Sequence, residues 1–85
     1  DNAKKSYRIA IEKLSTLVSK EPKSKMFRQD LALAQHNLGL LLLDIGELEE
    51  SGKELEAART LRQALATEFP ETPLLRKELA DSYID

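Results

Sequence analysis

Residues 37–58 read NLGLLLLDIGELEESGKELEAA and contain the transition between two helical patterns. Gly46 lies at the end of the first pattern, and a glycine in the left-handed conformation ends many helices. Three glutamates follow within four residues, and acidic side chains suit the positive end of a new helix. We therefore expect two antiparallel helices, with Gly39 of the first close to Ser51 or Gly52 of the second. Such an approach would offset the roughly 1 kcal/mol that a glycine inside a helix costs relative to alanine.

Apolar residues recur at helical spacings of three and four along the whole chain. Pro22 and Ser24 separate the first two segments as a helix stop and an N-cap, and Pro70 ends the third. No stretch alternates with a period of two over more than a few residues, so we expect no strand. The predicted fold class is all-α, with helices at about 2–20, 25–45, 47–69 and 73–84. The residues that share one helix face are Ala3, Tyr7, Ala10, Leu14 and Leu17 in the first helix, and Leu48, Ser51, Leu55, Ala58, Leu65 and Phe69 in the third.

Two stretches of the chain repeat at an offset of 48 residues. Apolar positions are kept while most polar positions vary, which is typical of proteins built from stacked helical units. The chain holds less than two periods, so we expect it to be an excerpt of a longer array. The function should then lie in a binding surface rather than in an active site. The identical pairs that define the repeat include Pro22 and Pro70, Arg28 and Arg76, Leu31 and Leu79, Ala32 and Ala80, Ala10 and Ala58, and Leu17 and Leu65.

The composition bounds the class of protein. The chain of 85 residues is 41% hydrophobic and 33% charged, which suits a small soluble helical protein and is too apolar for a disordered tail. No apolar run approaches the ~20 residues that cross a bilayer, and residues 1–5 do not resemble a signal peptide. Cysteine is absent, which excludes disulfides and thiolate metal sites. We expect a cytoplasmic protein with no membrane partner.

Charge is distributed unevenly along the chain. Residues 1–28 carry eight Lys and Arg against three acids, whereas residues 29–58 carry one Lys against seven acids. We interpret these charges as solvated helix faces; the alternative is that units of opposite sign attract one another in a head-to-tail stack. The basic excess is too thinly spread to indicate a nucleic-acid partner.

The sequence contains two spacings that are characteristic of paired helices: Leu-Gly-x-x-Leu on one helix, and small-x-x-x-large-x-x-Ala, which occurs twice. Their residues are Leu38, Gly39 and Leu42; then Ser51, Leu55 and Ala58; and, in the first segment, Ala3, Tyr7 and Ala10. This combination resembles the tetratricopeptide repeat. The resemblance implies a segment of a right-handed α-solenoid made of antiparallel helical hairpins, with residues 1–85 as a single segment. It also implies that Gly39 leaves room where the paired helices come closest, and that Tyr7 or Leu55 fills the gap.

Two features depart from that family. Gln35 stands where the family usually has a large aromatic residue, which weakens one contact. The period is 48 residues instead of the usual 34, and the difference adds about two turns to each helix, which keeps the inward faces inward. Long repeats with a Phe-Pro terminator, an Arg-x-x-Leu-Ala segment and a run like residues 37–43 resemble the non-catalytic regions of large bacterial serine/threonine protein kinases. That resemblance implies a kinase-associated regulatory or scaffold role.

The sequence contains no arrangement typical of an enzyme. The three glycines are isolated, so no phosphate-binding loop is present. His36 is the only histidine, and a lone histidine on a helix is more often packed or solvated than catalytic. Glu47, Glu50 and Glu54 share a face, but without a neighbouring His or Cys we interpret them as surface charge and not as a metal site. We expect no enzymatic activity, no cofactor and no metal.

Binding is the function that the pattern favours, through the second stripe of helix 25–45. In tetratricopeptide arrays the first helix of each hairpin lines a concave face that holds peptides, and the resemblance places this stripe there. Leucines occupy the positions where a clamp for a peptide C-terminal carboxylate would need cationic or amide groups, so we exclude that ligand type. The alternatives are burial of the stripe against a neighbouring repeat, and self-association of the chain as a homodimer. The candidate protein-binding residues are Gln29, Leu33, His36, Asn37, Leu40 and Leu43.

Overall fold

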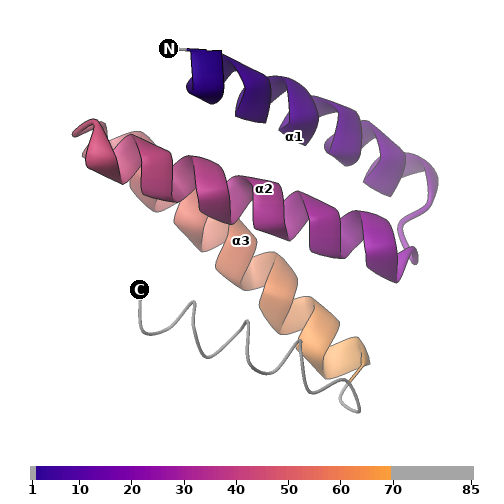
Figure 1. Ribbon diagram of the computed structural model, residues 1–85. Helices are drawn as coiled ribbons and strands as arrows, with labels where there is room; N and C mark the ends of the chain where they lie inside the picture. The colour runs from indigo at the N-terminus through magenta and orange to yellow at the C-terminus, as the bar shows by residue number, and fades with distance from the viewer. Residues whose placement is uncertain (1, 70–85) are drawn as a thin grey trace.

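The computed structural model describes residues 2–69 and places them in three α-helices joined by short turns (Figure 1). Helix α1 comprises Asn2–Lys20, α2 comprises Lys25–Asp44 and α3 comprises Leu48–Glu68. Consecutive helices run antiparallel, with α2 between the other two (Figure 1). No strand occurs in this part of the chain, which agrees with the predicted all-α class.

The observed helices differ from the expected ones by at most one residue at each end. The second helix stops one residue earlier than expected, and the third is one residue shorter at both ends. The expected fourth helix, at residues 73–84, lies outside the described residues.

Local chemistry sets both turns. The Ser24 hydroxyl accepts a hydrogen bond from the backbone N–H of Phe27 at 3.2 Å, which is the predicted N-cap of α2. Gly46 has a φ of +84°, the left-handed conformation predicted for it. The backbone N–H of Glu47 then donates to the carbonyl of Leu42 at 2.9 Å and closes the end of α2. The chain therefore reverses direction at Gly46 instead of continuing as one helix.

The core lies mainly between α2 and α3. Leu38 and Leu42 of α2 and Ala58 and Leu65 of α3 are all 0% exposed. Burying a leucine side chain contributes roughly 2 kcal/mol, so these contacts hold the hairpin together. By contrast, no residue of α1, all of which the structure describes, is fully buried. Among the described helices, α1 packs along α2, and most of its residues stay at least partly exposed.

Gly39 marks the closest contact of α2 with α3. A Cβ atom at this position would lie 2.6 Å from Cγ and Cδ2 of Leu55, so the leucine side chain occupies the space that the glycine leaves. The Ser51 hydroxyl donates a buried hydrogen bond of 2.7 Å to the Gly39 carbonyl. The expected proximity of Gly39 and Ser51 is confirmed, and Leu55 fills the gap.

Some of the residues expected in this interface do not lie there. Gly52 is exposed, and a Cβ atom added to it would meet nothing within 4 Å, so the expected close approach at Gly52 is wrong. The reason is helical phase, because one residue beyond Ser51 lies about 100° further around the helix. Leu48, expected on the same face as Ser51, is 65% exposed. On α1, Ala3 and Leu17 belong to the predicted apolar face, and both are exposed.

Ion pairs connect the N-terminal ends of α1 and α3. Lys4 Nζ lies 2.7 Å from Glu47 Oε2, and Arg8 pairs with Glu50. The basic first helix thus meets the acidic start of α3 within one chain. In these two pairs, basic residues of α1 hold it against the acidic end of the hairpin formed by α2 and α3.

The opposite end of the hairpin is held by Arg28 and Glu68. The Arg28 guanidinium is buried and donates two hydrogen bonds to the Glu68 carboxylate, one of them at 3.0 Å. These hydrogen bonds hold the pKa of Glu68 below its ordinary value and raise the pKa of Arg28. Nearby, Lys25 Nζ lies 5.0 Å from the centroid of the Phe69 ring, a cation–π distance. Polar contacts thus fix the start of α2 against the end of α3.

Candidate protein-interaction surface

Helix α2 has one face without a helical neighbour among the described residues. The residues that pack against α3, such as Leu38 and Leu42, lie on one side of α2, and those that face α1, such as Ala34, lie on the adjacent side. With 3.6 residues per turn, four of the six residues predicted to bind a partner lie on the remaining arc, and the other two, Leu33 and Asn37, lie where this arc borders α1. We call these residues the α2 stripe: Gln29, Leu33, His36, Asn37, Leu40 and Leu43.

Each member of the α2 stripe has accessible surface. Leu33 and Leu43 are 49% exposed and Leu40 is 37% exposed, whereas Gln29, His36 and Asn37 are half-buried. The three leucines are therefore accessible to a partner. The polar side chains between them are partly exposed to solvent. Whether a partner binds there stays a prediction.

The structure divides the α2 stripe in two. Leu33 and Asn37 also line a hollow of about 340 Å³ between α1 and α2, together with three residues of α1. Gln29, His36, Leu40 and Leu43 lie outside this hollow. The residues of α1 that line it are Tyr7, Ala10 and Leu14.

The α2 stripe carries no cation of its own. From Gln29 to Asp44 the sequence contains no Lys or Arg, and its two acids, Asp30 and Asp44, are both exposed. Asp30 also lines the hollow beside Asn37. The surface therefore combines leucine side chains with a weakly acidic border.

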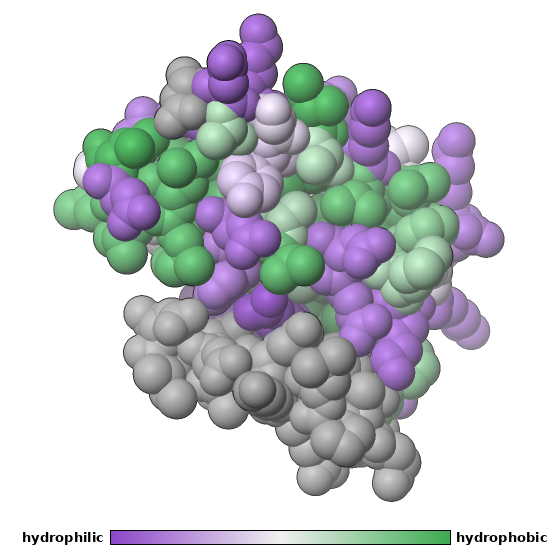
Figure 2. Space-filling model, in the orientation of Figure 1, coloured by the Kyte–Doolittle hydropathy of each residue, from purple (hydrophilic) through white to green (hydrophobic). Residues whose placement is uncertain are grey.

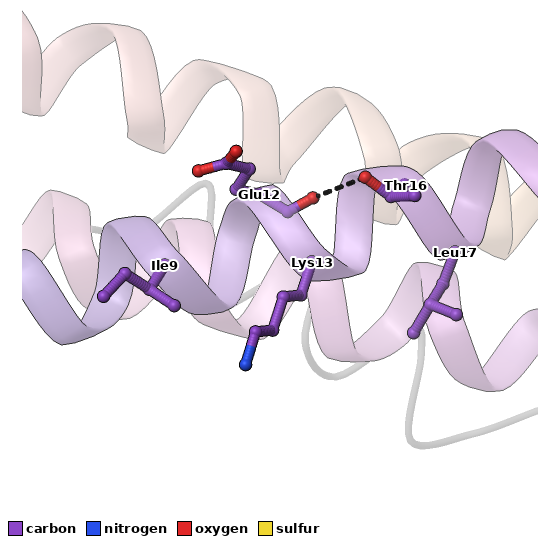
Figure 3. A pocket seen from close by; sticks show the side chains of 5 residues that line it. All are labelled: Ile9, Glu12, Lys13, Thr16 and Leu17. Atoms are coloured by element: carbon purple, nitrogen blue, oxygen red, sulfur yellow. Dashed lines mark hydrogen bonds between the residues drawn. The ribbon is translucent and has the colours of Figure 1, made fainter.

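Two accessible apolar features lie outside the six predicted binding residues. Met26 is well exposed and belongs to the same helical stripe by its spacing, although it is not among the predicted binding residues. On α1, the side chains of Ile9, Lys13 and Leu17 project in a row from one side of the helix (Figure 3). With Glu12 and Thr16 they line a shallow groove of about 510 Å³. Their spacing of four residues is the signal that could have indicated it.

Hydrophobic surface also gathers at the turn between α2 and α3. Figure 2 shows it in green over that end of the molecule. Leu43, Ile45 and Leu48 lie in this part of the chain, and each is about half exposed or more. The accessible apolar surface thus extends from the α2 stripe onto the start of α3.

The described residues give no sign of a metal centre or a membrane span. No group of three or more His, Asp or Glu side chains within residues 2–69 is placed to hold a metal ion. None of the three helices in this range combines the length and apolarity that a membrane span requires. Comparisons with protein-family models, with curated proteins and with solved structures found no match to this chain.

Proposed function

We propose that this chain is a protein-interaction scaffold segment of tetratricopeptide-like type that binds a peptide or protein through the α2 stripe. The observation that carries the proposal is the arrangement of α2 within residues 2–69: α1 and α3 occupy two sides, Leu40 and Leu43 stay accessible on the third, and Leu33 is accessible at the border with α1. The tetratricopeptide-like part is supported by the contact of Gly39 with Leu55 and Ser51, since these residues carry the resemblance in the sequence.

The chemistry of the α2 stripe suggests what the partner presents. Leu33, Leu40 and Leu43 lie at spacings of seven and three residues along one face of a helix, so the partner needs two or three apolar side chains along one line. Exposed Asp30 and Asp44 border the stripe, which favours a partner with Lys or Arg beside its apolar residues. The partner that fits is an amphipathic, basic peptide segment. Binding a peptide of this kind is compatible with a role of this chain as a regulatory or scaffold region of a larger protein kinase polypeptide, the context that the sequence resemblance suggests.

A displayed peptide library selected on the full chain tests this function. We expect recovered peptides to be apolar and basic, and to lose binding to a Leu40→Asp variant. Leu17→Glu is the matched control, because Leu17 is equally exposed but lies on α1. Peptides that bind both variants as well as the parent chain, or a selection that returns no binder, would contradict the proposal.

A further inference from the structure

Six positions of helix α2 follow the heptad pattern of a coiled coil. Along the helix they are separated by steps of three, four, three, four and three residues. We call these six residues the α2 seam. It contains five members of the α2 stripe and adds Met26, which is 61% exposed. In heptad letters, Met26, Leu33 and Leu40 are a positions, and Gln29, His36 and Leu43 are d positions.

The internal repeat separates the α2 seam from the packing positions of α2. Three buried residues near the start of α2 recur unchanged at an offset of 48 residues; they are Arg28, Leu31 and Ala32. The seam is not kept in this way. Met26 and His36 correspond to apolar residues, but Gln29 corresponds to Lys77 and Leu33 to Asp81. A charged residue in place of Leu33 does not suit a helix contact that every unit of a repeat array shares. We therefore assign the seam to a ligand and not to the packing of the array.

We propose that the α2 seam binds one amphipathic α-helix of a basic partner protein, packed along α2 as in a left-handed coiled coil. This inference rests on the proposed function, because it concerns the same face of α2. It adds the conformation of the partner and the spacing of its apolar and basic residues.

The spacing of the α2 seam fits a helix better than an extended segment. Met26, Leu33 and Leu40 follow one another at intervals of seven residues, which is about 10.5 Å along the axis of α2. The heptad positions of a second helix repeat at the same distance. Side chains on one face of a β-strand repeat at about 6.7 Å, and those of a polyproline II helix at about 9.3 Å. Neither extended form matches all three residues as a helix does.

The chemistry of the α2 seam also favours a helical partner. Gln29 and His36 are its only polar members, and both are half-buried. An extended segment along the seam would bring many backbone N–H and C=O groups to a surface with few groups to bind them. A helix satisfies these groups within itself and presents only side chains.

The flanks of the α2 seam specify the charge of the partner. Asp30 and Asp44 occupy e positions, are exposed and form no ion pair within residues 2–69. The other flank carries Ala32 and Gly39, which are both buried. Lys or Arg at the e and g positions of a docked helix would therefore face an acidic edge. A second copy of the chain in antiparallel orientation would instead place acidic edge against acidic edge, so charge favours a different, basic protein.

Designed peptides of three heptads test the inference. The probe is labelled with fluorescein, has Leu at its a and d positions and Lys at its e and g positions, and is titrated with the full chain at low salt. We expect binding, with more helix in the circular dichroism of the mixture than in the sum of the separate spectra. A second peptide carries proline at the outward-facing f position of its middle heptad and should bind at least tenfold more weakly, because proline breaks the helix. A third, with Glu in place of Lys, should bind roughly fivefold more weakly.

Variants of the chain locate the site. Met26→Ala should weaken binding of the Lys peptide roughly fivefold, and this change is specific to the inference because Met26 belongs to the α2 seam and not to the α2 stripe. Asp30→Lys combined with Asp44→Lys should reverse the preference between the Lys and Glu peptides. Leu17→Glu on α1 is the control and should leave binding unchanged. Circular dichroism checks that each variant folds.

Failure of the inference can be distinguished from failure of the proposed function. No binding of the Lys peptide up to about 1 mM, equal binding of the proline peptide, or a preference that the two Asp substitutions do not reverse would overturn the inference. If the displayed library returns segments without heptads that lose binding to Leu40→Asp, the inference is wrong and the proposed function stands. A concentration-dependent dimer in sedimentation that Leu40→Asp removes would assign the seam to a second copy of the chain, which would also overturn the inference.

Discussion

Replacing Gly39 by alanine should destabilise the chain, although the same change usually strengthens a helix. The new Cβ atom would lie 2.6 Å from Cγ and Cδ2 of Leu55 and 3.3 Å from the Leu55 backbone nitrogen. The side chain can rotate away, but the backbone nitrogen moves only with α3. The buried hydrogen bond from the Ser51 hydroxyl to the Gly39 carbonyl would be strained by the same movement.

The expected size of the effect follows from three terms. Overpacking at this contact should cost about 2 kcal/mol. Disturbing the Ser51 hydrogen bond should cost about 1 kcal/mol more. The higher helix propensity of alanine returns about 1 kcal/mol. We therefore expect Gly39→Ala to lower the free energy of unfolding by about 2 kcal/mol.

Gly52→Ala is the matched control for this measurement. Gly52 also lies inside a helix, but it is exposed and has nothing within 4 Å of an added Cβ atom. It should gain stability by about 1 kcal/mol, because only the propensity term applies. Urea unfolding followed by circular dichroism at pH 7 measures both variants, and a Leu55→Ala background should remove most of the penalty at Gly39. If Gly39→Ala stabilised the chain as much as Gly52→Ala, the close contact of α2 with α3 at Gly39 would be refuted.

Two further predictions concern polar groups at the helix contacts. The side-chain carbonyl Oε1 of Gln35 is buried without a hydrogen-bond partner among residues 2–69. Gln35→Met should therefore raise the free energy of unfolding, measured in urea, by about 1 kcal/mol. A fall of the same size would show that the Gln35 amide has its hydrogen bonds in the folded chain. Hydrogen bonds from Arg28 lower the pKa of Glu68 below 4.5, so the ion pair stabilises the fold above that pH and its contribution is lost as the pH falls through the lowered pKa. The stability advantage of the parent chain over Glu68→Gln should therefore be constant near neutral pH and shrink below pH 4.5; an advantage that persisted in acid would contradict the ion pair.

Residues whose role depends on local backbone chemistry could be predicted from the sequence. Gly46 and the Ser24 N-cap act within a few residues of chain, and both were assigned correctly. Gly39 could be placed because its spacing to Ser51 and Leu55 fixes which faces meet. Gly52 was misplaced because a glycine by itself does not show which side of the helix it lies on. Only the phase relative to buried neighbours decides that, and here Ser51 takes the contact.

Contacts between helices that are distant in sequence could not be predicted. The pairs of Lys4 with Glu47 and of Arg8 with Glu50 depend on how α1 is aligned along the hairpin, which composition does not determine. The same holds for the candidate surface. Helical periodicity was sufficient to place Leu40 and Leu43 on an open face of α2. It could not show that Leu33 and Asn37 share a hollow with α1, because that requires the packing of the two helices.

A pair of charge substitutions two residues apart tests most directly whether the α2 stripe is a free surface. Leu40 is 37% exposed, whereas Leu42 is 0% exposed and faces α3. We expect Leu40→Asp to change the free energy of unfolding by no more than about 1 kcal/mol, because its carboxylate stays in water. Leu42→Asp should cost about 4 kcal/mol or prevent folding, since it places an unpaired charge in the core. Urea unfolding of the two variants compares them, and a loss at Leu40 as large as the loss at Leu42 would show that the stripe is buried and is not an interaction surface.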